Sequence, residues 1–215
     1  MPPDVGARGG AQADDDGGDE AEKGDDDSRE KRLSHASKYH ASPFVARWIP
    51  ILAQHAPAPR RALDLAMGRG RHAVLLARAG FRTFGVDLTA EAVRDAMMRA
   101  AADRLLVRGW CADLTRFPLP AEWFDVVVVT RYLQRDLFAS IRDAVVPGGF
   151  VLYETFTVHQ RTFGVGPSST HHLLDDGELR SRFEDWEVMF YEEVIATEAV
   201  AQLVARKPAT RNRVR

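Results

Sequence analysis

The sequence contains a single cysteine, Cys111, among its 215 residues. One thiol cannot form an internal disulfide, which excludes a scaffold held together by such bonds and fits a reducing compartment. The sequence also has no apolar run that approaches the ~20 residues of a membrane-spanning helix. Its first residues are acidic and glycine-rich, unlike a signal or transit peptide. We therefore expect a cytoplasmic protein with no membrane partner.

The sequence also carries almost no net charge. The sequence has 29 Lys and Arg against 31 Asp and Glu, a formal net charge of -2, so nothing attracts nucleic acid globally and no such partner is expected. Acidic residues gather near the start and basic residues at the end. We predict a disordered acidic tail over residues 1–36, because large apolar side chains are almost absent there, and a flexible basic tail over residues 208–215. Residues 37–207 are expected to form one domain.

From residue 61 onward, short apolar runs alternate with helical stretches. The apolar runs predict buried strands over residues 62–66, 81–86, 105–109, 124–130 and 150–156. Helices are predicted over residues 71–79, 90–102 and 135–145, with Thr89 as N-cap of the second, and an earlier helix is predicted to begin after Ser42-Pro43 with Ser42 as its N-cap. This alternation indicates an α/β fold, with a mostly parallel sheet and helices on both faces.

The end of the sequence departs from this rhythm. Residues 175–178 form a capping box, which predicts a short helix that ends near Phe183. Residues 186–194 and 199–206 then predict two more strands. Only four residues separate them, too few for a crossover helix, so if the two strands pair with each other they must do so antiparallel. The expected sheet has seven strands and ends in an antiparallel hairpin.

A glycine-containing turn joins the first predicted strand to the helix that follows. Gly68 and Gly70 permit a tight turn in which backbone N–H groups at a helix N-terminus face a carboxylate or phosphate. Asp87 ends the next strand, where a carboxylate accepts hydrogen bonds from both ribose hydroxyls of an adenosine. Residues 68–73 match the pattern G-x-G-x-x-A of dinucleotide-binding proteins, so the loop alone fits either a dinucleotide or S-adenosylmethionine.

Further features favour S-adenosylmethionine. Asp64 lies before the loop, where it can orient the turn and meet an amino group through water. Asp113 follows the third strand, where its carboxylate can accept from the adenine amino group while the Leu114 N–H donates to a ring nitrogen. The turn Pro147-Gly148-Gly149 and the terminal hairpin complete the pattern.

With these motifs the sequence resembles the class I S-adenosylmethionine-dependent methyltransferases, from about Tyr39 to Arg206. Residues 64–70 resemble the first motif of that family, residues 85–88 the second, and residues 146–150 the turn before strand five. Residues 130–133, 152–156, 163–164 and 173–179 resemble more closely its tellurite-resistance-type, small-molecule branch. The family often has Gly at the position of Ala66, a mild change if the φ of Ala66 is negative, and Cys or Gly at that of Met67. Met67 either packs against the cofactor or fills the junction between strand and helix.

The resemblance implies a Rossmann-like methyltransferase fold and S-adenosyl-L-methionine as the cofactor. It implies that the loop from Asp64 through Gly68 to Gly70 holds the methionine part. The other cofactor contacts that it implies are Asp87 at the ribose, Leu88, Asp113 and Leu114 at the adenine, and Arg131 near the methionine end. No metal is implied, since the adjacent His171 and His172 point opposite ways on an extended chain.

The expected reaction is an in-line methyl transfer to a small-molecule acceptor. An NAD(P)-dependent oxidoreductase and a non-catalytic adenosine-ligand-binding module are the alternatives. A base is needed only if the nucleophile must lose a proton, so the sequence assigns no catalytic residue. An oxygen or nitrogen nucleophile would recruit Glu154, Tyr39 or His159. The acceptor pocket is expected between the first helix and residues 157–174.

Overall fold

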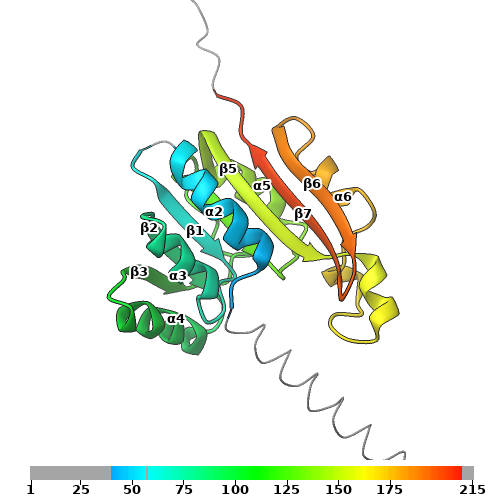
Figure 1. Cartoon of the computed structure of the whole chain (residues 1–215), viewed down its shortest axis with the longest axis horizontal. Helices are drawn as coiled ribbons and strands as arrows, with labels where there is room; N and C mark the ends of the chain where they lie inside the picture. The colour runs from blue at the N-terminus through cyan, green and yellow to red at the C-terminus, as the bar shows by residue number, and fades with distance from the viewer. Residues whose placement is uncertain (1–39, 57, 210–215) are drawn as a thin grey trace, which may run out of the picture. The chain divides into compact units, whose positions relative to one another are not determined.

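A computed structural model describes residues 40–56 and 58–209, which form an α/β unit around one seven-stranded sheet (Figure 1). Its strands are β1 (Arg61–Leu65), β2 (Arg82–Asp87), β3 (Val107–Cys111), β4 (Phe124–Thr130), β5 (Val145–Phe156), β6 (Glu187–Ile195) and β7 (Ala199–Arg206). Its helices are α2 (Pro43–His55), α3 (Arg71–Arg78), α4 (Ala90–Ala102), α5 (Leu137–Ala144) and α6 (Glu178–Ser181), with 3-10 turns η1 (Val158–Phe163) and η2 (Thr170–His172). The acidic tail predicted over residues 1–36 lies outside the described residues, as do residues 210–215 of the basic tail predicted over residues 208–215.

The strand order is β3-β2-β1-β4-β5-β7-β6. The first five strands pair parallel, whereas β7 pairs antiparallel with both β5 and β6. The predicted fold class and the terminal antiparallel hairpin are therefore confirmed. The chain reverses its direction of travel across the sheet between β1 and β4, and ligands of open α/β sheets bind at the carboxyl ends of the strands beside such a reversal.

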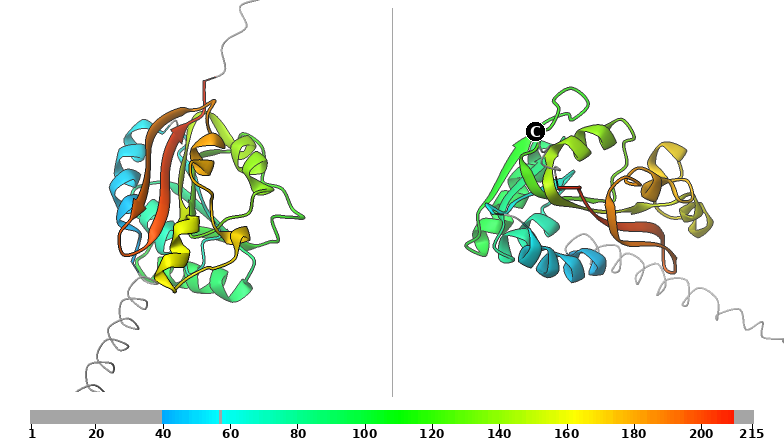
Figure 2. Two further views of the ribbon diagram at one scale, coloured as in Figure 1. Left: turned by 90° about the vertical axis from the view of Figure 1, so that its right-hand side faces the viewer. Right: turned by 90° about the horizontal axis from the view of Figure 1, so that it is seen from above.

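Helices cover both faces of the sheet (Figure 2): α2, α3 and α4 lie on one side, and α5 and α6 on the other. The central strand β4 is buried along its whole length. Its side chains divide between the two cores, since Val126 and Val128 pack with α2 while Val127 and Val129 pack with α5. This division explains the unbroken run of apolar residues in β4, because both of its faces are covered.

Three details of the elements correct the sequence prediction. Ser42 and Thr89 are N-caps by position, but neither side chain bonds to its own helix. In the 175–178 box, Glu178 accepts from the Asp175 N–H, yet the N-cap is Gly177, which has no side chain to return the bond. The β5 strand begins at Val145 rather than at Phe150, since the chain stays paired with β4 through a bulge.

None of the described helices is long and apolar enough to cross a bilayer.

Candidate functional site

Asp64 of β1 is wholly buried beneath the start of α3. Its Oδ2 accepts a hydrogen bond of 2.8 Å from the Ala73 N–H in the first turn of that helix, whose N-cap, Gly70, has no side chain. The carboxylate therefore caps the helix across the loop. Its Oδ1 is buried and has no hydrogen-bond partner in the part of the chain that the structure describes. Burial raises the pKa of Asp64 to about 7.

Asp87 ends β2 and joins the glycine loop to the next helix. Its Oδ2 accepts from the Gly68 N–H at 2.9 Å, and its Oδ1 accepts from the Thr89 N–H at 3.0 Å. The second bond satisfies the N–H of Thr89 itself and does not replace the cap predicted for the Thr89 side chain, which would accept from a residue further into α4. A carboxylate has lone pairs for about four hydrogen bonds, so both oxygens can still accept from a ligand.

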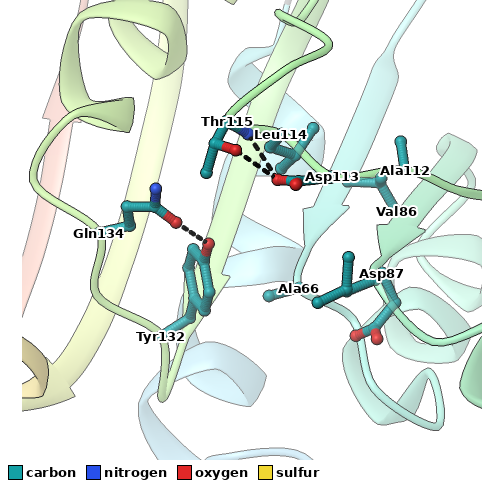
Figure 3. Close-up of a pocket in the computed structure, with 10 residues that line it drawn as sticks. Ala66, Val86, Asp87, Ala112, Asp113, Leu114, Thr115, Tyr132 and Gln134 are labelled. Atoms are coloured by element: carbon teal, nitrogen blue, oxygen red, sulfur yellow. Dashed lines mark hydrogen bonds between the residues drawn. The ribbon is translucent and has the colours of Figure 1, made fainter.

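A hollow of about 350 Å³ opens beside Asp87 (Figure 3). It is lined by Ala66, Val86, Asp87, Leu88, Ala112, Asp113, Leu114, Thr115, Tyr132 and Gln134. Four of the predicted cofactor residues thus meet in one place, and the apolar side chain of Leu88 is 70% exposed there. Gly68 adjoins the hollow through its bond to Asp87. The volume falls in the range of small-molecule sites.

Two polar pairs border this hollow. The Oδ1 of Asp113 accepts from the N–H and the hydroxyl of Thr115, and the side-chain bond lowers the pKa of Asp113. In the second pair the Tyr132 hydroxyl donates to Gln134 at 2.7 Å (Figure 3). Thr115 and Gln134 were not predicted, because nothing in their local sequence distinguishes them from ordinary loop residues.

The first motif departs from the sequence prediction at Ala66. Its φ is 53°, in the left-handed region, so alanine in place of the usual glycine is not the mild change that a negative φ would have made it. Met67 is 4% exposed and packs among Ala73, Val93 and Val107. It fills the junction between strand and helix, the second of the two roles considered for it.

Replacing Ala66 by Gly is expected to raise the free energy of unfolding by about 1 kcal/mol, because the strain of a left-handed alanine disappears. Urea unfolding measures the change. Ala79→Gly is the matched control: the φ of Ala79 is -77°, so glycine relieves nothing there and only adds freedom to the unfolded chain. Equal losses for the two variants would show that Ala66 is not strained in solution.

Arg131 follows β4 with a φ of 55°, but it does not line the hollow. Its Nη2 donates to Glu198 in the β6–β7 turn and lies 3.7 Å from Oε1 of Glu154. The guanidinium also lies over the ring of Phe156, 4.5 Å from its centroid. The structure thus gives Arg131 acidic partners, and contact with the methionine end of a cofactor stays a prediction.

A buried polar network that the sequence did not reveal surrounds His72. Burial lowers the pKa of His72 to about 3, so the imidazole is neutral. Its Nε2 accepts from the Ser42 N–H at 3.1 Å, so its Nδ1 carries the proton and donates to the Thr130 hydroxyl at 2.9 Å. The network fixes the start of α2 over the ends of β1 and β4. The local sequence around His72 gave no signal for this network, because Ser42 and Thr130 lie 30 and 58 positions away from His72.

The segment of residues 157–174 is fastened to the sheet. Thr157 and Leu174 form a parallel bridge, and the buried Gln160 accepts from the Ala199 N–H and donates to the Val165 carbonyl. His159 faces Asp176, with 2.9 Å between Nε2 and Oδ1. This contact places the imidazole against the exposed carboxylate of Asp176, whereas Tyr39 lies outside the described residues.

A family model of a methyltransferase domain matches residues 62–149, the span from β1 to the start of β5. Over this span the chain is similar to a methyltransferase domain, as expected from the sequence. The glycine loop, Asp64, Asp87 and Asp113 all lie within the matched span.

Among curated proteins, the chain is similar to hemagglutinin 1 of Eikenella corrodens, with 28% identity over 163 residues. The match covers 71% of this chain and 54% of that protein, so the chain spans about half the length of this relative.

Two solved structures illustrate the fold. TehB from Haemophilus influenzae has a TM-score of 0.64 and 19% identity, covering 78% of this chain and 62% of that one. A TehB-like SAM-dependent methyltransferase from Corynebacterium glutamicum has a TM-score of 0.58 and 18% identity, covering 88% of this chain and all (100%) of that one. These likenesses show the fold, which agrees with the fold class expected from the sequence.

Proposed function

We propose that the protein transfers the methyl group of S-adenosyl-L-methionine to a small-molecule acceptor by in-line displacement. The observation that carries this proposal is that two carboxylates border one hollow while a third lies by the adjoining glycine loop. Asp87 and Asp113 border it, and Asp64 lies behind the adjoining glycine loop with one buried oxygen that lacks a partner within the described residues. Such an oxygen is costly to leave without a hydrogen bond, so a ligand amino group suits it.

Each residue of the proposed site binds a different part of the cofactor. Asp87 holds the ribose hydroxyls, Leu88 packs on the adenine, and Asp113 and Leu114 hold the adenine edge. The loop at Gly68 and Gly70, with Asp64, holds the methionine part. We also propose Arg131 as the boundary of the site at the methionine end.

The cofactor supplies a methyl group that is already activated by the positive charge on sulfur. The protein therefore contributes mainly proximity and orientation. The sheet supports this role, because the groups around the site come from the ends of four packed strands rather than from one loop. That the acceptor is small rests on the resemblance to the small-molecule branch. A cytoplasmic location is proposed likewise, from the single thiol of Cys111.

The NAD(P) alternative has less support. The pattern of residues 68–73 fits it, but dinucleotide-binding sheets run 3-2-1-4-5-6, whereas here the antiparallel β7 lies between β5 and β6. A non-catalytic binding module would share the whole cofactor site, so only turnover separates it from an enzyme.

Asp87→Ala is expected to weaken the binding of S-adenosylhomocysteine about 100-fold, because two charge-assisted hydrogen bonds to the ribose are lost. Isothermal titration measures the affinity. Asp143→Ala, at an exposed position on α5, is the control and should bind like wild type. A turnover assay with thiols, tellurite, selenite, phenols and amines then tests the transfer itself. Tight NAD binding without S-adenosylhomocysteine binding would overturn the proposal, and binding without any turnover would favour the non-catalytic module.

A further inference from the structure

Four charged side chains from four different elements gather beyond the methionine end of the proposed cofactor site. They are Arg71 at the start of α3, Arg131 after β4, Glu154 on β5 and Glu198 in the β6–β7 turn. The Arg131 guanidinium lies between the two glutamates: it bonds to Glu198, and its Nη2 is 3.7 Å from Oε1 of Glu154. The charge of Arg71 also acts on that of Arg131 and of both glutamates.

Hydrogen bonds to one carboxylate oxygen hold the Glu154 side chain in place, and its other oxygen has no hydrogen-bond partner within the described residues. The side chain is 2% exposed, and its Oε2 accepts from the Ser42 hydroxyl at 3.0 Å and from the Gln202 amide at 2.8 Å. Its Oε1 is buried and has no hydrogen-bond partner among residues 40–56 and 58–209. The neighbouring Arg131 has the complementary deficit, since its Nη1 is buried and likewise without a hydrogen-bond partner in those ranges.

A buried acceptor and a buried donor that both lack a hydrogen-bond partner are unfavourable, even where the two side chains form an ion pair. They are complementary to one kind of ligand group, namely a group that donates one hydrogen bond and accepts another. A hydroxyl does both through a single oxygen.

The position of the pair relates it to methyl transfer. Glu154 pairs in register with Thr130, the last residue of β4, so its side chain stands at the carboxyl edge of the sheet. Thr130 bonds to His72 and Glu154 bonds to Ser42, which places both on the face covered by α2 and α3. Asp64 faces the same way, since it bonds to Ala73 of α3. The pair therefore lies on the side of the sheet that holds Asp64.

We propose that the nucleophile of the methyl acceptor is a hydroxyl oxygen, whose O–H donates to Oε1 of Glu154 while the oxygen accepts from Nη1 of Arg131. This inference rests on the proposed methyltransferase function and deepens it. As the O–CH₃ bond forms, the bond between methyl and sulfur breaks and its electron pair stays on sulfur. The hydroxyl proton passes to Glu154 and from there to solvent, and Arg131 stabilises the negative charge that grows on the oxygen before transfer.

The chemistry of the nucleophile explains why such a pair is useful. A phenolic hydroxyl has a pKa near 10 and is almost fully protonated at neutral pH, so it gains from a base. A thiol, with a pKa near 8.5, already supplies some thiolate and attacks without one. The other titratable groups that face Glu154 do not compete as bases, since Arg71 and Arg131 are cations, His72 is neutral with its Nε2 already bonded, and Glu198 is bound to Arg131.

The test begins with the atom that becomes methylated. The full-length protein is incubated with trideuteromethyl S-adenosylmethionine and a protein-free small-metabolite extract, and the labelled product is fragmented in a mass spectrometer. Label on oxygen is the expected result. Label on sulfur, selenium, tellurium or nitrogen overturns the inference and leaves the proposed function standing. No labelled product from a protein that binds S-adenosylhomocysteine overturns both.

Variants then test the two residues. Glu154→Gln keeps the shape and should lower kcat/KM for the hydroxyl acceptor by about 100-fold or more, the usual contribution of a general base, with S-adenosylhomocysteine affinity within about threefold of wild type. Glu184→Gln, an exposed glutamate, is the matched control. Arg131→Lys keeps a charge but not the fork of donors, and should lower kcat/KM while raising KM little.

A series of phenols separates a base from a structural group. If Glu154 removes the proton, the defect of Glu154→Gln must shrink from phenol to the more acidic 4-nitrophenol, which is partly ionised without help. A defect of equal size for both phenols would mean that Glu154 only shapes the site, and the inference would fail.

Discussion

Asp64→Asn is expected to raise the free energy of unfolding at pH 8 by about 2 kcal/mol and to weaken S-adenosylhomocysteine binding about 100-fold. Burial raises the pKa of Asp64 from its ordinary 3.8 to about 7, which corresponds to roughly 4 kcal/mol against the charged form. The Asn oxygen still accepts from the Ala73 N–H, but its NH₂ lacks a partner at a cost of about 1–3 kcal/mol. The affinity falls because the ligand amino group loses a carboxylate partner.

The pH dependence of this gain identifies its cause. The folded pKa of Asp64 lies above the unfolded value, so its contribution to stability is present below about pH 4 and is lost as the pH rises through 7. The gain from Asp64→Asn should therefore be present at pH 8 and vanish at pH 4. Urea unfolding at both values measures it, with exposed Asp143→Asn as the control. A gain of the same size at both values would contradict a buried charge as its source.

The pKa of His72 shifts in the opposite direction to that of Asp64, so in the wild-type protein the two effects on stability partly cancel. Its folded pKa of about 3 lies below the ordinary 6.5, hence its contribution is present above pH 6.5 and falls as the pH drops toward 3. Between about pH 4 and 6.5 the two residues offset each other. Wild-type stability should be nearly flat across this window, whereas Asp64→Asn, which leaves His72 alone, should lose stability with acid.

The parts of the fold that the sequence predicted are those with a local periodic signal. The four valines at residues 126–129 of β4 form a run with no polar residue inside it, and the predicted bounds of the strand, residues 124–130, agree with the structure at both ends. The hairpin followed from a loop too short for a crossover, which is a constraint on chain length rather than on packing. The start of β5 was misplaced, since Pro147-Gly148-Gly149 resembles a turn but is accommodated within the strand.

The residues of the candidate site also fall into those that the sequence could predict and those that it could not. Asp64, Asp87 and Asp113 were predictable because each lies at or just after a strand end, and parallel strands bring those ends together. The partners of Glu154 were not, because Ser42 and Gln202 lie 112 and 48 positions away and meet it only through packing. The φ of Ala66 was likewise hidden, since no residue type announces a left-handed alanine.

Gly70→Ala is expected to lower the free energy of unfolding by about 3 kcal/mol, against about 1 kcal/mol for Gly68→Ala. Both glycines have positive φ, 74° and 51°, so both variants pay for a left-handed alanine. Only Gly70 also meets a neighbour: a Cβ there would lie 2.6 Å from Cβ of Ala96 on α4, whereas a Cβ on Gly68 has open space around it. Overpacking of a buried contact typically adds about 1–3 kcal/mol.

A double-mutant cycle with Ala96→Gly isolates this contact. Ala96→Gly alone should cost about 1 kcal/mol as a glycine within a helix. In Gly70→Ala/Ala96→Gly the two Cβ atoms no longer collide, so the double variant should be more stable than the sum of the single losses by about 1–2 kcal/mol. Additive losses would mean that the loop moves away from α4 at no cost. Non-additive losses, together with weaker S-adenosylhomocysteine binding for Gly70→Ala than for Gly68→Ala, would show that α4 sets the position of the loop. The glycine pattern at residues 68 and 70 then reflects two separate physical demands, a backbone turn at one position and close helix packing at the other.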